Sequence, residues 1–447
     1  MTYAELLAQL IPARRFGVVF GLERMRAILD RLGGAGPAPD RRLGAVVHVG
    51  GTNGKGSTVA MIAALAAAAG QRVATYTSPH LSCLRERIVL DGAMISEAAI
   101  VAAGDRVRAA GGDELTFFEQ ITAIAMLAIA DAAVDVTVVE VGLGGRLDAT
   151  NVVDPAVAVV TGVALDHEAI LGGTVAAIAA EKAGIWKPGR PAIVGASGLP
   201  EAVPLLVEAA RAAGAVPLVI DDAAVAAVPA VGLAGEHQRR NAAAAIAAVR
   251  ALGLPIIPSA LATVRHPGRF EIIEPPLTPP GVPRIILDGA HNPHGAAALA
   301  AALQARGDRP VVIAAVSADK DVAAIARTLS PVARAVVATR YQQERAMEPA
   351  RLAAAFAEAR RALRAPSATA GDGAAAADRA AGDAGAADPA DDGVATAPDL
   401  AAAIALAATY RAPIVIAGSL FLVGEARTLL LGAPTDPMLI TDPPAVR

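Results

Sequence analysis

The segment GAVVHVGGTNGKGSTVAMIAALAAAAG, residues 44–70, decides the fold. A short run rich in β-branched residues leads into a glycine-rich turn, and an alanine-rich stretch that favours a helix follows. A strand, a glycine-rich loop and a helix in this order place backbone N–H groups and a helix N-terminus where they can hold phosphate. The segment therefore predicts a phosphate-binding loop.

The loop itself departs from the usual G-x-x-x-x-G-K-[ST] spacing, because Gly56 separates Lys55 from Ser57. We expect Lys55 to reach the terminal phosphates of a nucleotide, with Ser57 or Thr58 near a metal ion. The alternative is a glycine-rich turn with a solvated lysine. The residues expected to bind the nucleotide here are Gly51, Thr52, Asn53, Gly54, Lys55, Gly56, Ser57 and Thr58.

The same alternation of apolar runs and alanine-rich stretches recurs along the chain. Candidate strands occur at 44–49, 72–77, 134–141, 156–163, 191–195 and 216–220, and again at 284–290, 310–316, 334–339 and 413–418. Strands that alternate with helices predict an α/β fold. We expect an N-terminal P-loop ATPase-type domain with a mainly parallel sheet, and a smaller C-terminal Rossmann-like α/β domain.

Proline and glycine cluster twice near the expected junction, at HPGRF (266–270) and at EPPLTPPGVP (274–283). We place the linker at the first cluster, because RFEII and RIIL on either side of the second read as the strands of a hairpin. This gives an ATP-binding domain over 1–263 and a C-terminal domain over 264–447.

Two further segments have a clear composition. A helical stretch is expected to open the chain at 2–32. The residues from about 364 to 396 are almost wholly Ala, Asp and Gly, with too few large apolar groups to offset the entropy of ordering them. They predict a mobile surface insertion without a catalytic role.

Composition excludes several classes of protein. The net charge is −4 with both signs interspersed, so nucleic acid is not an expected partner. Much of the 54% hydrophobic fraction is alanine, and polar residues interrupt each apolar run before the ~20 residues that a membrane-spanning helix needs. The N-terminus shows no export signal, and Cys83 has no second thiol. We expect a cytoplasmic protein that does not contact a membrane.

Functional side chains follow the predicted strands at the edge where ligands collect in parallel α/β sheets. Thr77, Ser78 and His80 follow the second strand, Glu140 ends the third, and Asp166 and His167 follow the fourth. Glu140 and His167 can coordinate a divalent cation such as Mg²⁺, which phosphoryl transfer requires. The alternatives are a surface carboxylate for Glu140 and a loop or cap residue for His167. GLGGRLDATN (142–151) suits a substrate-gripping loop, or is only a tight turn.

With these segments in order, the chain resembles the folylpolyglutamate synthase and dihydrofolate synthase family, a branch of the Mur ligase superfamily. The resemblance covers nearly the whole chain and includes HVGGTNGKGST (48–58), TSPHL (77–81), ERI (86–88), TFFEQITA (116–123), VEVGLGGRLDATN (139–151), IAAEKAGIWK (178–187), GEHQRRNAA (235–243), PGRFE (267–271) and LDGAHNP (287–293). Departures are the alanine-rich insertion, Gly50 where alanine is common, and His266 where a tryptophan is expected.

The resemblance implies an ATP-dependent carboxylate–amine ligase that uses two Mg²⁺ ions. ATP would phosphorylate a carboxylate of dihydropteroate or of a reduced folate, and the amine of L-glutamate would attack the acyl phosphate. It implies that Lys55, Glu140, His167 and Lys182 are catalytic. The implied metal ligands are Ser78, Glu140, His167 and Lys182, the last as a carbamate.

The resemblance also implies contacts outside the phosphate loop. For ATP, which it places between the two domains, these are Asn241, Arg269, Asp288 and His291. For the pterin they are Thr116, Phe118, Asp148 and Ala149. The residues alone favour plainer roles: Glu181 and Lys182 as a solvated helical pair, His237 and Asn241 as capping or packing residues, Phe117 and Phe118 as core.

Two other functions stay open on the sequence. One is a Mur-type cell-wall amino-acid ligase, which shares the fold and the nucleotide chemistry. The other is a non-ligase nucleotide-binding switch or assembly ATPase. GLGGRLDATN together with TFFEQITA favours the pterin acceptor. The expected partners are therefore small molecules, and a monomer is expected.

Overall fold

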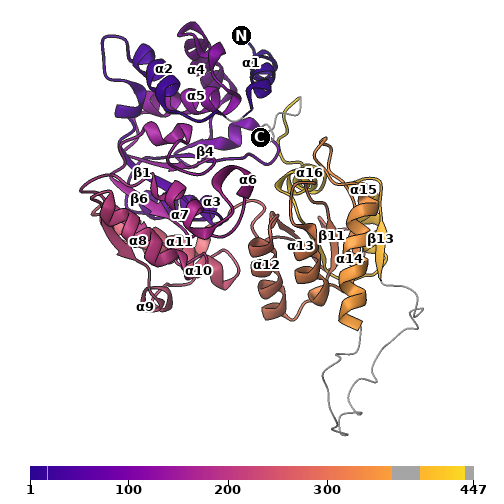
Figure 1. Cartoon of the computed structure of the whole chain (residues 1–447). Helices are drawn as coiled ribbons and strands as arrows, with labels where there is room; N and C mark the ends of the chain where they lie inside the picture. Colours follow the sequence, from indigo (N-terminus) through magenta and orange to yellow (C-terminus); the bar gives the residue numbers. More distant parts are fainter. Residues whose placement is uncertain (18, 365–392, 438–447) are drawn as a thin grey trace. The chain divides into compact units, whose positions relative to one another are not determined.

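The computed structural model describes residues 1–17, 19–364 and 393–437, which divide into two compact units. The first comprises Met1–Arg269 and the segment that starts at Ala433, and the second comprises Phe270–Gly432 (Figure 1). The division falls inside HPGRF, a few residues after the predicted boundary between 263 and 264. The segment from Ala433, which the prediction assigned to the C-terminal domain, belongs to the first unit.

An eight-stranded sheet forms the centre of the first unit, in the order β4-β3-β2-β5-β1-β6-β7-β8. Its strands are β1 (Ala45–Gly50), β2 (Val73–Tyr76), β3 (Ile88–Leu90), β4 (Ala93–Met94), β5 (Val136–Glu140), β6 (Val157–Val160), β7 (Pro191–Val194) and β8 (Val216–Val219). The six predicted strands are present and pair in parallel. No pattern predicts the antiparallel β3 and β4, because two or three residues are too few to show a period.

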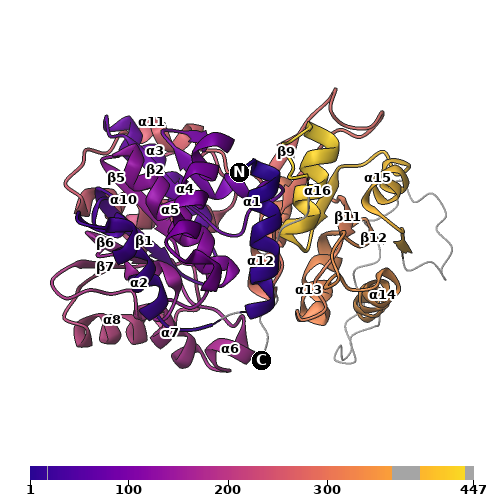
Figure 2. The ribbon, with the colours of Figure 1, turned by 90° about the horizontal axis from the view of Figure 1, so that it is seen from above.

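Helices cover both faces of this sheet, because alternate side chains of a strand point to opposite faces. Val47 and Val49 of β1 pack with α3 and α10 on one face, and Val46 packs with α4 and α5 on the other. Helices α4 and α5 lie side by side in Figures 1 and 2. The helices are α1 (Tyr3–Leu10), α2 (Glu23–Gly33), α3 (Lys55–Ala68), α4 (Glu97–Ala109), α5 (Phe117–Ala132), α6 (Glu168–Leu171), α7 (Val175–Ala183), α8 (Ala202–Ala212), α9 (Asp222–Ala226), α10 (Glu236–Ala251) and α11 (Pro258–Thr263).

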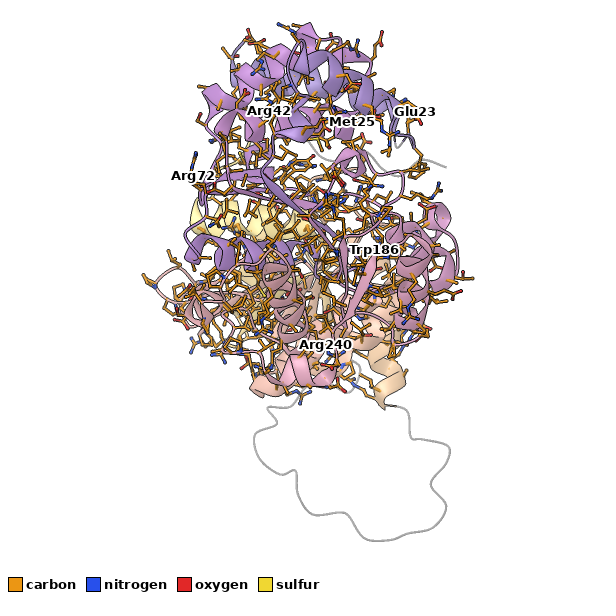
Figure 3. The ribbon with its side chains drawn as sticks, turned by 90° about the vertical axis from the view of Figure 1, so that its left-hand side faces the viewer. Glu23, Met25, Arg42, Arg72, Trp186 and Arg240 are labelled. Atoms are coloured by element: carbon orange, nitrogen blue, oxygen red, sulfur yellow. The ribbon has the colours of Figure 1, made fainter. Side chains whose placement is uncertain are left out.

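The opening stretch, predicted to be helical over 2–32, contains two α-helices separated by a 3₁₀ turn and a short loop. Helix α1 begins with a capping box between Thr2 and Glu5. Pro12 lies in the 3₁₀ turn Ile11–Phe16 that follows, and Gly17 ends that turn with a φ of 61°. Proline cannot donate a backbone hydrogen bond, and a positive φ reverses the chain, so the α-helix cannot continue. Helix α2 then buries Met25 (Figure 3). Trp186, also labelled in Figure 3, belongs to a different core cluster, which contains residues of α7 and α8.

The second unit contains a six-stranded sheet in the order β13-β12-β11-β14-β10-β9. Its strands are β9 (Glu271–Ile273), β10 (Ile285–Asp288), β11 (Val311–Ala314), β12 (Ala335–Ala338), β13 (Val394–Thr396) and β14 (Ile414–Ala417), and its helices are α12 (Pro293–Arg306), α13 (Val322–Leu329), α14 (Pro349–Arg364), α15 (Leu400–Ala408) and α16 (Leu420–Leu431). Strand β9 pairs antiparallel with β10, as the expected hairpin requires, and the other pairs are parallel. The predicted fold class is confirmed for both units.

The predicted insertion, at about 364–396, overlaps ordered elements at both of its ends. Arg364 is the last residue of α14, and β13 pairs with β12 through Val394 opposite Val336. Pairing along an existing strand supplies backbone hydrogen bonds that composition does not reveal. Residues 365–392 lie outside the described residues. Within the described part of the chain, no helix has the length and apolar character needed to cross a bilayer.

A substitution at Gly198 tests how tightly the turns after β6 and β7 pack. Ser197 N donates to Thr161 O at 2.9 Å and Leu199 N donates to Val163 O at 2.8 Å. A Cβ on Gly198 would lie 2.2 Å from Val163 N. We expect Gly198→Ala to lower the free energy of unfolding by about 2 kcal/mol, since backbone atoms must move apart. Urea denaturation measures this.

Gly36→Ala is the matched control, because a Cβ there meets only Gly33 O at an ordinary 3.6 Å. Equal midpoints for the two variants would contradict the close approach of the turns.

Candidate active site

The phosphate loop lies between the end of β1 and the start of α3, where the sequence places it. Gly54 caps α3 with a φ of 83°, and a Cβ there would lie 2.5 Å from Asn241 Oδ1. Gly51 has a φ of 138°, and its Cβ would lie 1.9 Å from Thr161 Oγ1. Only glycine meets both the backbone angle and the available space at these two positions.

The turn after β6 holds this loop in place. Thr52 N donates to Gly162 O at 2.9 Å, and Thr52 Oγ1 donates to Ala164 O at 3.1 Å. Thr161 Oγ1 donates to Asn53 O at 2.6 Å. The conformation of the loop is therefore fixed by the neighbouring strand's turn, which pre-organises its amides toward a ligand.

Two lysines donate to one carbonyl oxygen of the loop. Lys55 Nζ lies 3.2 Å from Gly51 O, and Lys182 Nζ, from α7, lies 3.1 Å from the same atom. Lys182 is only 5% exposed. Burial, and next the charge of Lys55, lower its pKa from 10.5 to about 7. The interpretation of Lys182 as a solvated residue is therefore wrong, although Glu181 does point outward and pairs with Arg146 at 2.7 Å.

Glu140 ends β5 beside the phosphate loop, because β5 pairs with β1 in a register that sets Glu140 opposite Val49. Its carboxylate is 5% exposed, so the interpretation as a surface group is wrong. Oε2 accepts a hydrogen bond from Ser78 N at 3.2 Å. Burial raises the pKa of Glu140, and the nearby charge of Lys55 and the Ser78 amide lower it in part. Lys55 therefore acts electrostatically on both Glu140 and Lys182.

His167 begins the short helix α6 with a φ of 53° and has a partly exposed ring. Its Nε2 lies 4.0 Å from Asp166 Oδ2, and the charge of Asp166 raises the pKa of Lys182. Among residues that the structure describes, no three His, Cys, Asp or Glu side chains group as a metal site. The predicted set has only Glu140 and His167 of these types, so its other donors are the Ser78 hydroxyl and a modified Lys182.

Asn241 belongs to a buried chain of hydrogen bonds that reaches the phosphate loop. Ser197 Oγ donates to Asn241 Oδ1 at 2.7 Å, and Asn241 Nδ2 donates to Gln238 Oε1 at 3.1 Å. Gln238 Nε2 then donates to Ser57 Oγ at 3.2 Å. The side chain of Asn241 thus supports Gly54 and, through Gln238, orients Ser57. The Oγ1 atom of Thr58 is buried without a partner in the described part of the chain.

Arg269, Asp288 and His291 occupy two different units. Arg269 ends the first unit, where its charge lowers the pKa of Glu140. Asp288 ends β10 in the second unit and accepts from Phe270 N and Ala290 N, each at 2.9 Å. His291 Nδ1 lies 2.8 Å from Gly289 O. A carbonyl can only accept, so Nδ1 carries the proton in the neutral ring and Nε2 is the basic nitrogen.

The predicted pterin residues surround the start of α5 and the turn after β5. Thr116 caps α5 in a capping box with Glu119. Phe118 is half-buried, stacks on Tyr76 with ring centroids 6.4 Å apart, and would clash with a Cβ on Gly142 at 2.4 Å. Phe117, in contrast, lies fully in the core. A partly open aromatic face beside a glycine suits a flat ring.

Asp148 ties the GLGGRLDATN turn to β1. Its carboxylate accepts from Leu143 N at 2.8 Å and from Thr150 N at 3.0 Å, and also from the Thr150 hydroxyl. Thr150 Oγ1 lies 2.9 Å from Nε2 of the buried His48 on β1. Because the Thr150 hydroxyl donates its proton to Asp148, Thr150 Oγ1 accepts a hydrogen bond from His48 Nε2. Ala149, the next residue, is buried in this turn.

Arg87 is a residue of this region that the sequence analysis did not assign a role. It is 0% exposed, and its Nε donates to His80 Nδ1 at 2.9 Å. Its guanidinium lies 5.8 Å from the Phe117 ring centre and lowers the pKa of Glu140. The ERI motif contains Arg87, but the sequence predicts an exposed side chain for an arginine at the start of a strand. Its contacts come from the turn between β2 and β3, where Thr77 N donates to Arg87 O at 2.9 Å and His80 accepts from Arg87 Nε.

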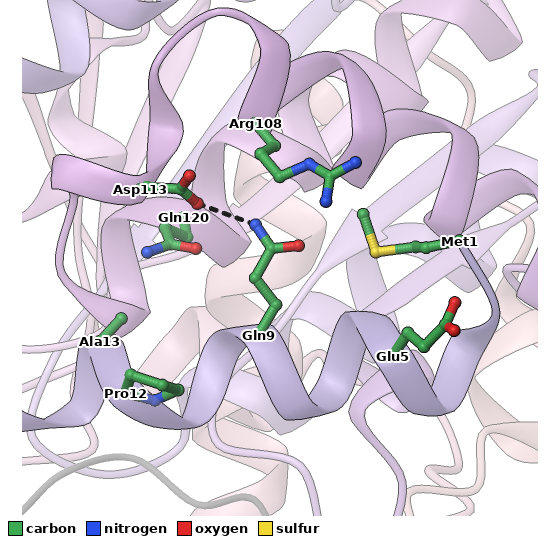
Figure 4. A pocket seen from close by; sticks show the side chains of 8 residues that line it. All are labelled: Met1, Glu5, Gln9, Pro12, Ala13, Arg108, Asp113 and Gln120. Carbon is green, nitrogen blue, oxygen red and sulfur yellow. Dashed lines mark hydrogen bonds between the residues drawn. The ribbon is translucent and has the colours of Figure 1, made fainter.

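A separate pocket of about 690 Å³ lies between α1, the end of α4 and the start of α5 (Figure 4). Gln9 Nε2 donates to Asp113 Oδ1 across it at 2.8 Å. The lining residues are Met1, Glu5, Gln9, Pro12, Ala13, Arg108, Asp113 and Gln120. None of these is a predicted site residue, and the hydrogen bond between Gln9 and Asp113 already pairs two polar groups that face each other across the pocket.

Comparison with known proteins gives concordant results. The chain matches the family models "Mur ligase middle domain" at residues 49–195 and "Mur ligase, glutamate ligase domain" at residues 268–420. The Escherichia coli protein named dihydrofolate synthase/folylpolyglutamate synthase is 38% identical over 332 residues, 68% of this chain and 73% of that protein.

Solved structures agree with this. Mycobacterium tuberculosis folylpolyglutamate synthase complexed with ADP matches with a TM-score of 0.80 and 32% identity, over 97% of this chain and 100% of that chain. A bifunctional folylpolyglutamate synthase/dihydrofolate synthase with Mn, AMPPNP and L-glutamate bound matches with a TM-score of 0.76 and 28% identity, over 95% and 98%.

The buried His48 predicts a loss of stability in acid. Burial, and next the charge of Lys187, lower its pKa from 6.5 to about 3 in the folded state. Between these values only the unfolded chain binds the proton, so stability falls as the pH drops from about 6.5 toward 3. We expect His48→Gln, which keeps a donor for Thr150, to lose less stability than the parent protein between pH 7.5 and pH 4.5. Urea unfolding at both pH values gives the difference, and parallel acid losses would contradict it.

Proposed function

Because the chain belongs to the dihydrofolate synthase/folylpolyglutamate synthase family, a Mur ligase family whose members are ATP-dependent glutamate ligases, we propose that it acts on two acceptors. It joins L-glutamate to dihydropteroate and to the terminal glutamate of reduced folates, and releases ADP and phosphate. The observation that carries this proposal is the convergence of Lys55 and Lys182 on Gly51 O beside the buried Glu140.

Lys55 supplies positive charge where phosphate chemistry needs it. Its ammonium is held at the first turn of α3 by two carbonyl oxygens of the loop, those of Gly51 and Thr52. A fixed cation at a helix N-terminus stabilises negative charge on a transferring phosphoryl group without reorganisation at the moment of reaction. The acceptor carboxylate thereby becomes an acyl phosphate, which the glutamate amine attacks.

A divalent cation suits the donors beside Lys55. Glu140 is a buried carboxylate whose pKa burial raises, so a nearby cation favours its charged form. Ser78 and Glu140 offer oxygen atoms, which Mg²⁺ prefers, and their contact through Ser78 N holds them together. Mg²⁺ bound there would neutralise phosphate oxygens. We assign Ser78, Glu140 and His167 to this role, and a carbamate on Lys182 to a second ion.

Carbamylation of Lys182 is consistent with its environment. A neutral amine attacks CO₂, forms an N–C bond and releases one proton. A pKa of about 7 leaves a substantial neutral fraction at neutral pH. The product is an anion, and the Lys55 ammonium, which donates to the same Gly51 carbonyl oxygen, would then attract it where it now repels the lysine cation.

The remaining assignments are part of the same proposal. We assign Asn241, Arg269, Asp288 and His291 to the nucleotide, and Thr116, Phe118, Asp148 and Ala149 to the pterin. Asn241 and Asp148 would act mainly by shaping backbone, because their side chains already bond within the protein. A cytoplasmic monomer without a nucleic-acid partner completes the proposal. The names of the relatives favour it over a cell-wall ligase or a non-ligase ATPase.

Substrate-dependent ADP release tests the function together with Lys55. With ATP, Mg²⁺ and L-glutamate present, we expect dihydropteroate and tetrahydrofolate each to stimulate ADP release. Lys55→Ala should lower that rate at least about 100-fold, because a preorganised charge in the transition state is lost. Arg190→Ala is the control, since this exposed cation pairs only with the exposed Asp154 in the described structure.

Three outcomes would overturn this proposal. They are near-normal ADP release by Lys55→Ala, stimulation by a UDP-sugar acceptor in place of the folates, and turnover that does not depend on glutamate.

Intact-mass and ¹³C NMR measurements in ¹³C-bicarbonate test the carbamate. We expect one carbamate signal that Lys182→Ala removes and that Lys187→Ala, a half-exposed control lysine, retains. Activity of Lys182→Ala should fall at least about tenfold and recover partly with formate or acetate, which replace the missing anion. A Lys182→Ala enzyme with full activity would contradict the assignment.

A further inference from the structure

The chain returns to the first unit after α16, and its last described residues bind beside helix α1. Gly432 ends α16 with a φ of 61°, and the segment Ala433–Pro437 belongs to the first unit. Asp436 N donates to Ser82 O at 3.1 Å, and Ser82 Oγ donates to Pro434 O at 3.0 Å. This segment is thus fixed to the turn between β2 and β3 by one backbone hydrogen bond and by one from the Ser82 hydroxyl.

The Asp436 carboxylate joins two elements far apart in sequence. One oxygen accepts from Tyr3 Oη at 2.8 Å, and the other accepts from Leu84 N at 2.8 Å. Tyr3 and Leu84 are both buried, and burial together with Asp436 raises the pKa of the Tyr3 hydroxyl, so that it stays a donor. Charged acceptors make stronger hydrogen bonds than neutral ones.

Two carboxylates accept hydrogen bonds from the backbone N–H groups of this turn. Glu86 accepts from Leu81 N at 2.7 Å and from Cys83 N at 3.2 Å. Asp436 accepts the next donor, Leu84 N. The turn therefore folds around one carboxylate of its own and one that arrives from more than 350 positions later in the chain.

Ser78, before this turn, is assigned to the metal, and Arg87, after it, acts on Glu140 through its charge. Ser78 precedes it and touches Glu140, and Arg87 follows it and binds His80. The Ser78–Glu140 contact and the Arg87–His80 contact hold the two ends of the turn, while Asp436 and Glu86 hold its middle. A turn held at its middle keeps a single conformation at its ends.

We propose that Asp436 is a positioning residue for the ligase reaction: it holds the Leu81–Leu84 turn so that Ser78 stays in place for the metal. The inference rests on the proposed function and deepens it. It predicts that changes at Asp436 affect the binding of Mg²⁺ more than that of L-glutamate.

Steady-state kinetics of the full chain provide the test. In Asp436→Ala we expect the Mg²⁺ concentration for half-maximal rate to rise about 10-fold, as when an outer support of a metal ligand is lost. The KM for L-glutamate should stay within about twofold. Asp436→Asn keeps one acceptor oxygen and should give a smaller rise, as should Tyr3→Phe, which keeps the ring over which Arg85 lies at 5.7 Å. Thr435→Ala, at an exposed neighbouring position, is the control and should match the parent.

Limited trypsin digestion supplies a second measurement that does not depend on activity. Arg85 directly follows the turn, in the 3₁₀ helix Leu84–Arg87, with 19% of its side chain exposed. We expect cleavage after Arg85 to become several-fold faster in Asp436→Ala than in Thr435→Ala. Unchanged Mg²⁺ dependence with unchanged cleavage would overturn the proposal, as would an equal rise in every kinetic constant with a lowered melting temperature. If no acceptor stimulates ADP release, the proposed function fails, while the cleavage rates still report whether Asp436 holds the turn.

Discussion

The parallel pairing of β1 with β5 and β6 is the constraint on which the site depends. Val49 lies opposite Glu140, and Gly50 lies opposite Val160, so all three strands end at one level. The turn after β1 is the phosphate loop, β5 ends on a carboxylate, and the turn after β6 supplies Thr161 and Gly162. A change of register by one residue would turn every side chain of β5 to the other face. The register that buries every residue of β5 therefore also places Glu140 beside Lys55.

Glu140 and Lys182 are buried, and neighbouring charges act on each of them. An isolated buried carboxylate or ammonium is expensive, and a neighbour of opposite sign reduces that cost. Glu140 lies within the influence of Lys55, Arg269 and Arg87, whereas Lys182 faces Lys55 and is favoured only by Asp166 and Asp148. The Lys182 and Lys55 ammonium groups also approach the same carbonyl oxygen, that of Gly51. An anion bound beside both, whether phosphate or carbamate, would reduce the repulsion between them.

The sequence predicts the strands, the loop and Glu140 because these depend on local pattern. The charge of Lys182 favours an exposed position, yet Ile178 and Ala179, four and three positions before it, are buried on the same helix face. This spacing is the sequence signal for the burial of Lys182. The burial of Arg87 could not be predicted, since it follows from the fold of the turn between β2 and β3. Neither could β13 nor the contact of Asp436 with Tyr3, because both depend on partners distant in sequence.

Strand β1 also connects the phosphate loop with the turn assigned to the acceptor. His48 projects from β1 and donates to Thr150, which donates to Asp148, and Asp148 accepts from Leu143 N. The chain of hydrogen bonds is buried, so breaking any link leaves a polar group without a partner. A displacement of β1 would therefore move the phosphate loop at its end and the acceptor turn at its face together. In the proposed function, one strand thereby sets the distance between the nucleotide and the acceptor, which an in-line attack of carboxylate on phosphate requires to be constant.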